Sequence, residues 1–371
     1  MDIYKKLGVQ TLINAVDTYT IIGGSTMPDE VINAMVDASK HFVNIDQLQR
    51  KAGERIASLT KNEGAYITSG ASAGLAISTA ACITGTDPAK VEQLPDTSHL
   101  KNEVIIHRCQ RNGYDHAIRQ VGVKLVEIGN VDITHTWQLE NAITDKTACI
   151  VYFMASTFSK GALPLNEVIK IGKKYSIPII VDAAAQLPPV ENLWKYTHMG
   201  ADMVVFSGGK TLRGPQASGV VLGKQELIEA CKVNGSPNHS LGRSMKVGKE
   251  EIVGLLAAIE RYVNLDHRKI MNQLEAMVSY IQKKLSFPGI TVTRLFPGPV
   301  GQTYPRALVH FSRESKHSAI NVKEKLEDGD PCIIVGLTED KSGIIINPLN
   351  LQDNEVDIIL NRITQILNND E

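Results

Sequence analysis

Residues 201–216 of this chain read Ala201-Asp-Met-Val-Val-Phe-Ser-Gly-Gly-Lys210-Thr-Leu-Arg-Gly-Pro-Gln216, a short apolar segment that passes through two glycines to a lysine. The apolar segment predicts a buried strand, and the glycines allow a flat ligand to approach the backbone. A lysine whose pKa is lowered by burial and neighbouring charge can hold an aldehyde cofactor covalently. A surface lysine after a Gly-Gly turn is the alternative for these residues alone.

The composition is that of an ordinary soluble protein of 371 residues, with 43% hydrophobic and 21% charged residues and a net charge of -1. This balance predicts neither a nucleic-acid nor a membrane partner, and no apolar stretch approaches the roughly 20 residues of a membrane helix. The start of the chain does not resemble a signal peptide. Five scattered cysteines without a Cys-x-x-Cys pair favour a cytoplasmic protein without a structural metal site.

Apolar segments alternate with helical ones through the first two thirds of the chain, which predicts a mostly parallel sheet with right-handed crossovers. Ligands of such sheets bind at the carboxyl ends of the strands. Polar residues follow the predicted strands at five places, so we expect them to share one edge of the sheet: Ser69 with Gly70, Arg108, Ser156, Asp182 and Lys210.

The predicted fold class is therefore α/β, with a mostly parallel central sheet, flanking helices and a smaller α+β C-terminal domain. We predict an N-terminal arm and helix over 1–45 and a large cofactor-binding domain over 46–242. A bridging helix is expected over 243–264, and the small domain over 265–371.

A loop between the first predicted strand and a helix of small residues reads Thr68-Ser-Gly-Ala-Ser72. Backbone N–H groups at a helix N-terminus, with hydroxyl groups beside them, form a site for a phosphate. The loop has neither the Walker pattern nor a dinucleotide fingerprint, so by itself it fits an anion site or a tightly packed helix equally. The predicted cofactor contacts are Ser69, Gly70, Ala71 and Ser72.

Asp182 ends the apolar strand 177–181, where a carboxylate is costly to bury unless it meets a cation. Pyridoxal phosphate carries such a cation in its protonated pyridine nitrogen, and it also needs a Schiff-base lysine and an anion site. The chain supplies an acid for the ring nitrogen in Asp182, a lysine in Lys210 and an anion site in the 68–72 loop. Ser207 is expected to add a hydroxyl group to the phosphate site, and Ser156 to reach the phenolic oxygen. A helix cap is the alternative for Asp182, and a turn role for Ser156.

These segments resemble the fold-type-I pyridoxal phosphate enzymes, within them the group that includes bacterial selenocysteine synthase (seryl-tRNA selenium transferase) and D-glucosaminate-6-phosphate ammonia-lyase. The resemblance is carried by Ile13-Asn-Ala15, Tyr66 to Gly74, Ile180 to Ala185, Phe206 to Gln216 and Gly242 to Glu250. It extends further toward the ammonia-lyase, through Asn44-Ile-Asp46, Leu94 to Ser98 and Asn102-Glu-Val104. A tRNA-handling synthase would be expected to show an extra basic module, and a net charge of -1 suits tRNA poorly.

The resemblance implies a lyase that eliminates water and ammonia from a 2-amino-3-hydroxy acid, with Lys210 and Asp182 as catalytic residues. An amino acid or amino sugar acid substrate needs cationic groups for its carboxylate, for which Arg243 comes first and Arg108 and Arg213 next. A surface charge or salt bridge is the alternative for each arginine. Tyr114 or His116 is a candidate to stack on the cofactor ring.

The resemblance also implies a homodimer or higher homo-oligomer. Other enzymes of the same fold remain as alternatives, namely a selenocysteine synthase-like transferase, an aminotransferase or an aldolase. A non-catalytic protein that keeps this fold is a more distant alternative.

Overall fold

The structure is a computed structural model and describes residues 3–352 and 354–368. It separates into two compact units, and each is described by itself. The large unit contains Ser25–Leu265 and Pro299–Gly301, and the small unit contains Met1–Gly24, Asp266–Gly298 and Gln302–Glu371. The outer ends of the predicted domains, residues 1–2 and 369–371, lie outside the described residues.

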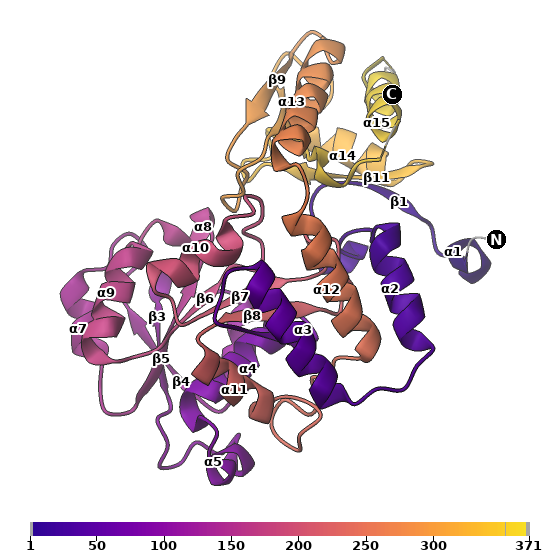
Figure 1. The fold of residues 1–371 in the computed structure, drawn as a ribbon. Helices are drawn as coiled ribbons and strands as arrows, with labels where there is room; N and C mark the ends of the chain where they lie inside the picture. The colour runs from indigo at the N-terminus through magenta and orange to yellow at the C-terminus, as the bar shows by residue number, and fades with distance from the viewer. Residues whose placement is uncertain (1–2, 353, 369–371) are drawn as a thin grey trace. The chain divides into compact units, whose positions relative to one another are not determined.

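A seven-stranded sheet forms the centre of the large unit (Figure 1), with strand order β2-β8-β7-β6-β5-β3-β4. β8 is antiparallel to both of its neighbours, and the other pairs are parallel. The carboxyl ends of the six remaining strands therefore lie along one edge, which confirms the predicted mostly parallel sheet. The strands span Gly64–Thr68 (β2), Glu103–His107 (β3), Lys124–Ile128 (β4), Thr147–Phe153 (β5), Ile179–Asp182 (β6), Met203–Ser207 (β7) and Gly219–Gly223 (β8).

Helices cover both faces of this sheet because successive strand residues point to opposite sides. In β5, Tyr152 packs in one apolar cluster, whereas Val151 and Phe153 pack in the other. The first cluster contains residues of α3 (Ile45–Leu59), α7 (Thr136–Ala142), α9 (Leu165–Tyr175), α10 (Asn192–Met199) and α12 (Lys249–Val263). The second contains residues of α4 (Ala71–Thr84), α6 (His116–Arg119) and α11 (Gln225–Asn234).

Small residues let α4 lie close against the strands. A Cβ atom on Gly74 would come within 2.8 Å of Cγ1 of Val205 in β7, so a larger residue would push the helix away from the sheet. Three further helices lie in the large unit: α2 (Asp29–Ser39), α5 (Pro88–Gln93) and α8 (Ser156–Ser159). α2 begins at Asp29, directly after Pro28, and the acidic Asp29 and Glu30 in its first turn favour the positive end of the helix dipole.

The helix predicted from Arg243 begins six residues later, at Lys249 in α12. The backbone of Gly248 is extended, with φ -80° and ψ 163°. A helix cannot continue through this conformation, so α12 begins only after Gly248. Glu250 and Glu251 fall in the first turn of α12, where acidic side chains favour the positive end of the helix dipole. Arg243 therefore lies in the turn segment before the helix and not in the helix.

The small unit is built on a five-stranded sheet of order β1-β11-β12-β10-β9. β1 pairs in parallel with β11, with Leu12 opposite Cys332, so the N-terminal segment forms part of a sheet made otherwise of C-terminal residues. The strands span Leu12–Ala15 (β1), Ile290–Leu295 (β9), Arg306–Phe311 (β10), Cys332–Leu337 (β11) and Gly343–Ile346 (β12). Its helices are α1 (Ile3–Leu7), α13 (His267–Lys284), α14 (Ala319–Glu327) and α15 (Glu355–Asn368). No helix in the described part of the chain has the length and apolar character needed to cross a membrane.

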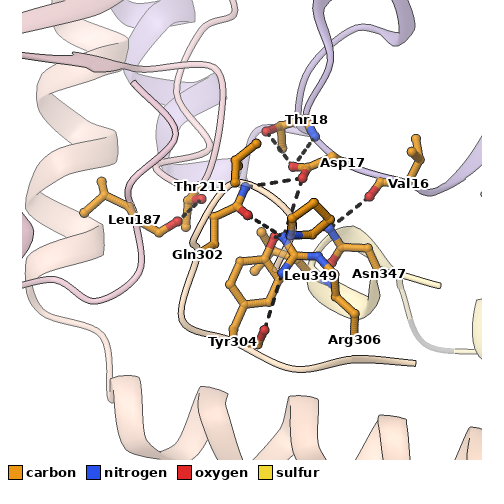
Figure 2. A network of polar contacts seen from close by, with 12 residues as sticks. Val16, Asp17, Thr18, Leu187, Thr211, Gln302, Tyr304, Arg306, Asn347 and Leu349 are labelled. Carbon is orange, nitrogen blue, oxygen red and sulfur yellow. Dashed lines mark hydrogen bonds and ion pairs between the residues drawn. The ribbon is translucent and has the colours of Figure 1, made fainter. Parts of the chain in front are cut away.

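A buried arginine lies at the start of β10 (Figure 2). Arg306 is 1% exposed, and its Nη2 donates to Oε1 of Gln302 at 3.0 Å and to the hydroxyl oxygen of Tyr304 at 2.7 Å. The same nitrogen lies 3.5 Å from Oδ2 of Asp17, and Nδ2 of Asn347 donates to the Tyr304 hydroxyl at 3.1 Å. Because a buried cation is costly without such partners, this network ties the segment after β1 to β10 and β12.

A buried histidine generates a prediction about stability. His107 ends β3, and its Nε2 accepts a hydrogen bond from the backbone N–H of Leu163 at 3.2 Å. Burial lowers its pKa to about 4. The folded state therefore favours the neutral ring, and the stability that His107 contributes is lost as the pH falls from about 6.5 to 4. We expect the free energy of unfolding to decrease over this range by up to about 3 kcal/mol through this residue.

Urea unfolding between pH 7 and pH 4.5 measures this effect. His107→Gln should show a shallower decrease than the natural protein, whereas His116→Gln, at an exposed site in the same region, should keep the natural slope. Equal slopes for all three proteins would contradict the assignment.

Candidate active site

Asp182 and Lys210 follow two neighbouring parallel strands. Asp182 is the last residue of β6 and pairs with Val205 of β7, and Lys210 lies in the turn after β7. Burial raises the pKa of the Asp182 carboxyl group, while the backbone N–H of Ala184 and the positive charge of Lys210 act to lower it. The Ala184 N–H donates to Oδ1 at 2.9 Å. The structure thus brings the predicted acid and lysine into electrostatic contact.

Glycines are required on the N-terminal side of Lys210. A Cβ atom on Gly208 would come within 2.0 Å of Oγ of Ser218, and one on Gly209 within 2.6 Å of Cα of Gln216. The backbone N–H of Gly208 also donates to the carbonyl oxygen of Ser218 at 2.8 Å. Lys210 is therefore presented by a tightly packed turn and is only partly exposed, unlike a lysine on a free surface loop.

The predicted phosphate loop starts α4 at the carboxyl end of β2. Gly70 precedes the helix with φ +137°, a conformation that favours glycine, and its carbonyl oxygen accepts from the Thr68 hydroxyl at 2.8 Å. Among the described residues, no side chain caps this helix start, so the first backbone N–H groups, at Ala71 and Ser72, are available to an anion. A Cβ atom on Gly219 of β8 would lie 2.7 Å from the Ala71 nitrogen.

The loop is also tethered to the segment before α12. The hydroxyl group of Ser69 donates to the carbonyl oxygen of Met245 at 3.1 Å. Ser72 is exposed, and Ser207 is the half-exposed last residue of β7. The hydroxyl groups of the predicted phosphate site thus belong to β2, α4 and β7, which meet along the carboxyl edge of the sheet.

Ser156 opens α8 after β5, but its hydroxyl proton is already used. Its Oγ donates to the carbonyl oxygen of Pro299 at 2.9 Å, and its backbone N–H donates to that of Val300 at 3.3 Å. Nε2 of Gln186 donates to the same Val300 oxygen at 3.1 Å. A hydrogen bond from Ser156 to a cofactor oxygen would require the contact with Pro299 to break.

The three predicted arginines have different surroundings. Arg108 forms an ion pair with Glu127 of β4, its Nε lying 3.0 Å from Oε2. Arg213 donates from Nε to the carbonyl oxygen of Thr26 at 2.7 Å and from Nη2 to its hydroxyl oxygen at 3.0 Å. The exposed side chain of Arg243 forms no hydrogen bond or ion pair with the residues that the structure describes. Of the three, Arg243 is therefore the one whose guanidinium group is free for a ligand.

Tyr114 and His116 both lie after β3 at the surface. Tyr114 is 64% exposed, and His116 is exposed at the start of α6. Within the described chain, no hydrogen bond joins either side chain to Asp182 or Lys210. Stacking on a cofactor ring needs no such bond, so the role of these two residues stays a prediction.

Two contacts near the site were not predicted from the sequence. The hydroxyl group of Ser25 donates to the carbonyl oxygen of Gly209 at 3.1 Å, so a segment nearly 200 residues away supports the lysine turn. Gln110 is fully buried, and its side chain both accepts from and donates to the backbone of Phe153 at 3.2 Å. A single serine in a turn and a glutamine after a strand carry no signal in the sequence that distinguishes them from surface residues.

Comparison with known proteins matches residues 12–292 to the family model described as L-seryl-tRNA selenium transferase. The chain belongs to this family. It is 34% identical to a D-glucosaminate-6-phosphate ammonia lyase of Salmonella typhimurium over 372 residues, which cover 98% of both chains. It is also 34% identical to a 5'-C-glycyluridine monooxygenase-decarboxylase of a Streptomyces species, over 89% of this chain and 83% of the relative.

A solved structure of D-glucosaminate-6-phosphate ammonia-lyase matches with a TM-score of 0.87 and 33% identity, covering all of both chains. An SPT structure that contains PLP shares the fold at a TM-score of 0.61 and 14% identity. The protein is an enzyme of the fold-type-I class that uses pyridoxal phosphate. This family membership confirms the predicted fold class, cofactor and resemblance.

The residues at the sheet edge fit this cofactor. The carboxylate of Asp182 is desolvated and its pKa is raised, so it lacks a full counter-charge, which a protonated pyridine nitrogen would provide. The uncapped start of α4 suits a phosphate group, and the packed turn presents the amine of Lys210. The roles of the individual residues are proposals that the following variants test.

Asp182→Asn should separate two effects of this carboxylate, its destabilisation of the folded state and its role in catalysis. Because the folded-state pKa is raised, the charged carboxylate opposes folding as the pH rises through that pKa. We expect the cofactor-free variant to melt at the same temperature as the natural protein or higher at pH 7.5, while activity falls by about 100-fold or more. Asp132→Asn, at an exposed ion pair, should change neither property. A lower melting temperature with unchanged activity would contradict the assignment.

Lys210→Ala tests the covalent attachment of the cofactor. Borohydride reduction of the natural holoenzyme should give a stable cofactor adduct on the peptide that contains Lys210, detected by mass spectrometry. The variant should give no adduct there and lose activity by about 100-fold or more, because both the tether and the proton acceptor are removed. Lys283→Ala, at an exposed position of α13, serves as the control. An adduct on another lysine of the natural protein would contradict the prediction.

Proposed function

We propose that this enzyme eliminates water and ammonia from a 2-amino-3-hydroxy acid, of the kind of D-glucosaminate 6-phosphate, and releases a 2-keto-3-deoxy acid. The observation that carries the proposal is the ammonia lyase match over 98% of both chains. One water leaves in the elimination and one is taken up in the final hydrolysis. The net products are therefore the keto acid and ammonium.

Three parts of the large unit would hold the cofactor and move the proton. When bound, the cofactor supplies an electron sink for the bond that breaks at the substrate Cα. Lys210 would bind its aldehyde, the start of α4 its phosphate, and Asp182 the N–H of its ring. Once free, Nζ of Lys210 would take the proton from the substrate Cα and pass it to the hydroxyl group on Cβ, which would leave as water. The desolvated setting of Asp182 favours this assignment, because a buried carboxylate keeps a partner cation protonated.

Arg243 is the proposed site for an anionic group of the substrate. Its guanidinium group is exposed and free of partners in the described residues, and it can bind a carboxylate or phosphate through two parallel hydrogen bonds. The tether between Met245 and Ser69 holds its segment beside the proposed phosphate site of the cofactor. Arg108 and Arg213 are weaker candidates, because Arg108 already pairs with Glu127 and Arg213 already donates to Thr26.

A second candidate function is an oxygen-dependent decarboxylation, since the monooxygenase-decarboxylase relative is also 34% identical. That alignment covers less of both chains than the ammonia lyase alignment does. A transferase, aminotransferase or aldolase of the same fold remains a further alternative.

We also propose that the enzyme is a cytoplasmic homodimer or higher homo-oligomer. Large apolar side chains are exposed on α2 and just after it, namely Ile32, Val36, Phe42 and Val43, the third of them fully. A second copy of the chain is the proposed cover for this surface.

A panel of D- and L-2-amino-3-hydroxy acids, with and without a terminal phosphate, tests the proposed reaction. We expect ammonium and a 2-keto acid in equal amounts, without consumption of oxygen or release of carbon dioxide. Oxygen uptake with carbon dioxide release would favour the second candidate. Conversion of the bound cofactor to its amine form by an amino acid alone would favour an aminotransferase.

Arg243→Gln tests the anion site with the substrate that this panel identifies. We expect KM to rise by about tenfold or more with a smaller change in kcat, because a charge-assisted contact to the substrate is lost in the bound state. Arg268→Gln, at an exposed position of α13, should behave as the natural enzyme. An unchanged KM would show that another residue binds the substrate anion.

A further inference from the structure

A cavity of about 340 Å³ opens in the small unit between the end of β10, the start of α14 and the turn that joins β11 to β12. Basic and hydroxyl side chains dominate its lining. The basic residues are Arg313, Lys316, His317 and Lys341, and the remaining lining residues are four serines, Phe311 and Ala319. No carboxylate belongs to this lining.

Two of these cations are free to bind a ligand. Among the residues that the structure describes, Arg313 and Lys341 form no hydrogen bond or ion pair through their side chains. The nearest acidic groups along the chain are Glu314, which is exposed, and Asp340. Asp340 accepts from the hydroxyl group of Ser342 at 2.8 Å, and contacts with hydroxyl and backbone groups lower its pKa to about 2. The charge of Asp340 is therefore directed at those donors, and Arg313 and Lys341 keep no ion-pair partner among the described residues.

A buried nitrogen of the lining also lacks a partner. Nε2 of His317 is enclosed and forms no hydrogen bond with the described residues, while Nδ1 lies 3.4 Å from Oδ1 of Asn321. A buried polar atom without a partner is costly, and this nitrogen belongs to a residue that lines the cavity.

The start of α14 adds donors to the same space. The side chain of Ser318 caps the helix by accepting from the backbone N–H of Asn321 at 3.1 Å. The N–H groups of the residues between them have no partner within the helix, and the helix dipole adds partial positive charge at this end.

We propose that this cavity binds a compact phosphate group, either free phosphate or the phosphate of a small phosphorylated metabolite. Guanidinium, ammonium and backbone N–H groups are the donors that phosphate recognition uses. Phe311 and Ala319 also line the cavity, and the carbon part of a metabolite would pack against these apolar side chains. The site uses none of the residues assigned above to the cofactor or to the substrate, and it does not depend on the proposed reaction.

Calorimetric titration of the borohydride-reduced holoenzyme tests the proposal, because the phosphate site of the cofactor is then already filled. The probes are inorganic phosphate and glucose 6-phosphate, with glucose as the uncharged comparison. We expect the Arg313→Gln/Lys341→Gln variant to bind phosphate at least about tenfold more weakly than the natural protein. Arg268→Gln/Lys283→Gln removes the same two residue types from exposed positions of α13 and should keep the natural affinity.

The two probes distinguish the sources of the phosphate group. Tighter binding of glucose 6-phosphate than of phosphate would indicate a phosphorylated metabolite, and the reverse would indicate free phosphate. Absence of binding by both probes, or equal loss in both double variants, would overturn the proposal. Melting curves of each variant with and without phosphate report both folding and binding. If the double variant does not fold, Arg313→Gln alone replaces it. A phosphate-dependent rise in melting temperature should occur in the natural and control proteins and be absent from the cavity variant.

Discussion

A partly buried carboxylate at the end of β6, that of Asp182, governs what the active site can bind. Desolvation raises the pKa of Asp182, and the two groups that oppose this effect, the N–H of Ala184 and the charge of Lys210, do not cancel it. A group in this position is costly to the free protein, because burial disfavours the charged form. It becomes favourable when a cation binds beside it, and pyridoxal phosphate brings such a cation in its ring nitrogen.

Close backbone contacts hold this arrangement in place. The lysine turn packs against residues 216–218, so Gly208 and Gly209 cannot accept a larger side chain. β8 contacts the start of α4 so closely that Gly219 cannot accept one either, and Gly70 has a positive φ that favours glycine. These contacts leave backbone N–H groups exposed at one edge of the sheet while the strands behind them are fully buried. Buried strands and backbone N–H groups free at their carboxyl edge together provide the pre-formed geometry that a covalently bound cofactor needs.

Positive charge is used differently in the two units. In the large unit, Arg243 is the proposed contact for the substrate because its neighbours leave it free, whereas Arg108 and Arg213 are occupied by Glu127 and Thr26. In the small unit, Arg306 is surrounded by partners that neutralise and orient it. Arg313 and Lys341, by contrast, face a cavity without a counter-charge. Only the surroundings separate a structural arginine from one that is available to a ligand.

Local patterns predict the parallel sheet, its carboxyl edge and the places of Asp182 and Lys210 at that edge, because apolar runs followed by polar or glycine residues are read from neighbours in the chain. Features that depend on distant partners are set by the tertiary fold. The pairing of β1 with β11, the support of Gly209 by Ser25, and the partners of Arg306 join residues far apart in the chain, and no local pattern encodes them. The start of α12 at Lys249 depends on the extended backbone of Gly248, since glycine permits a helix as well as a break. Whether the guanidinium group of Arg243 is free for a ligand likewise depends on the side chains around it, which lie far apart in the sequence.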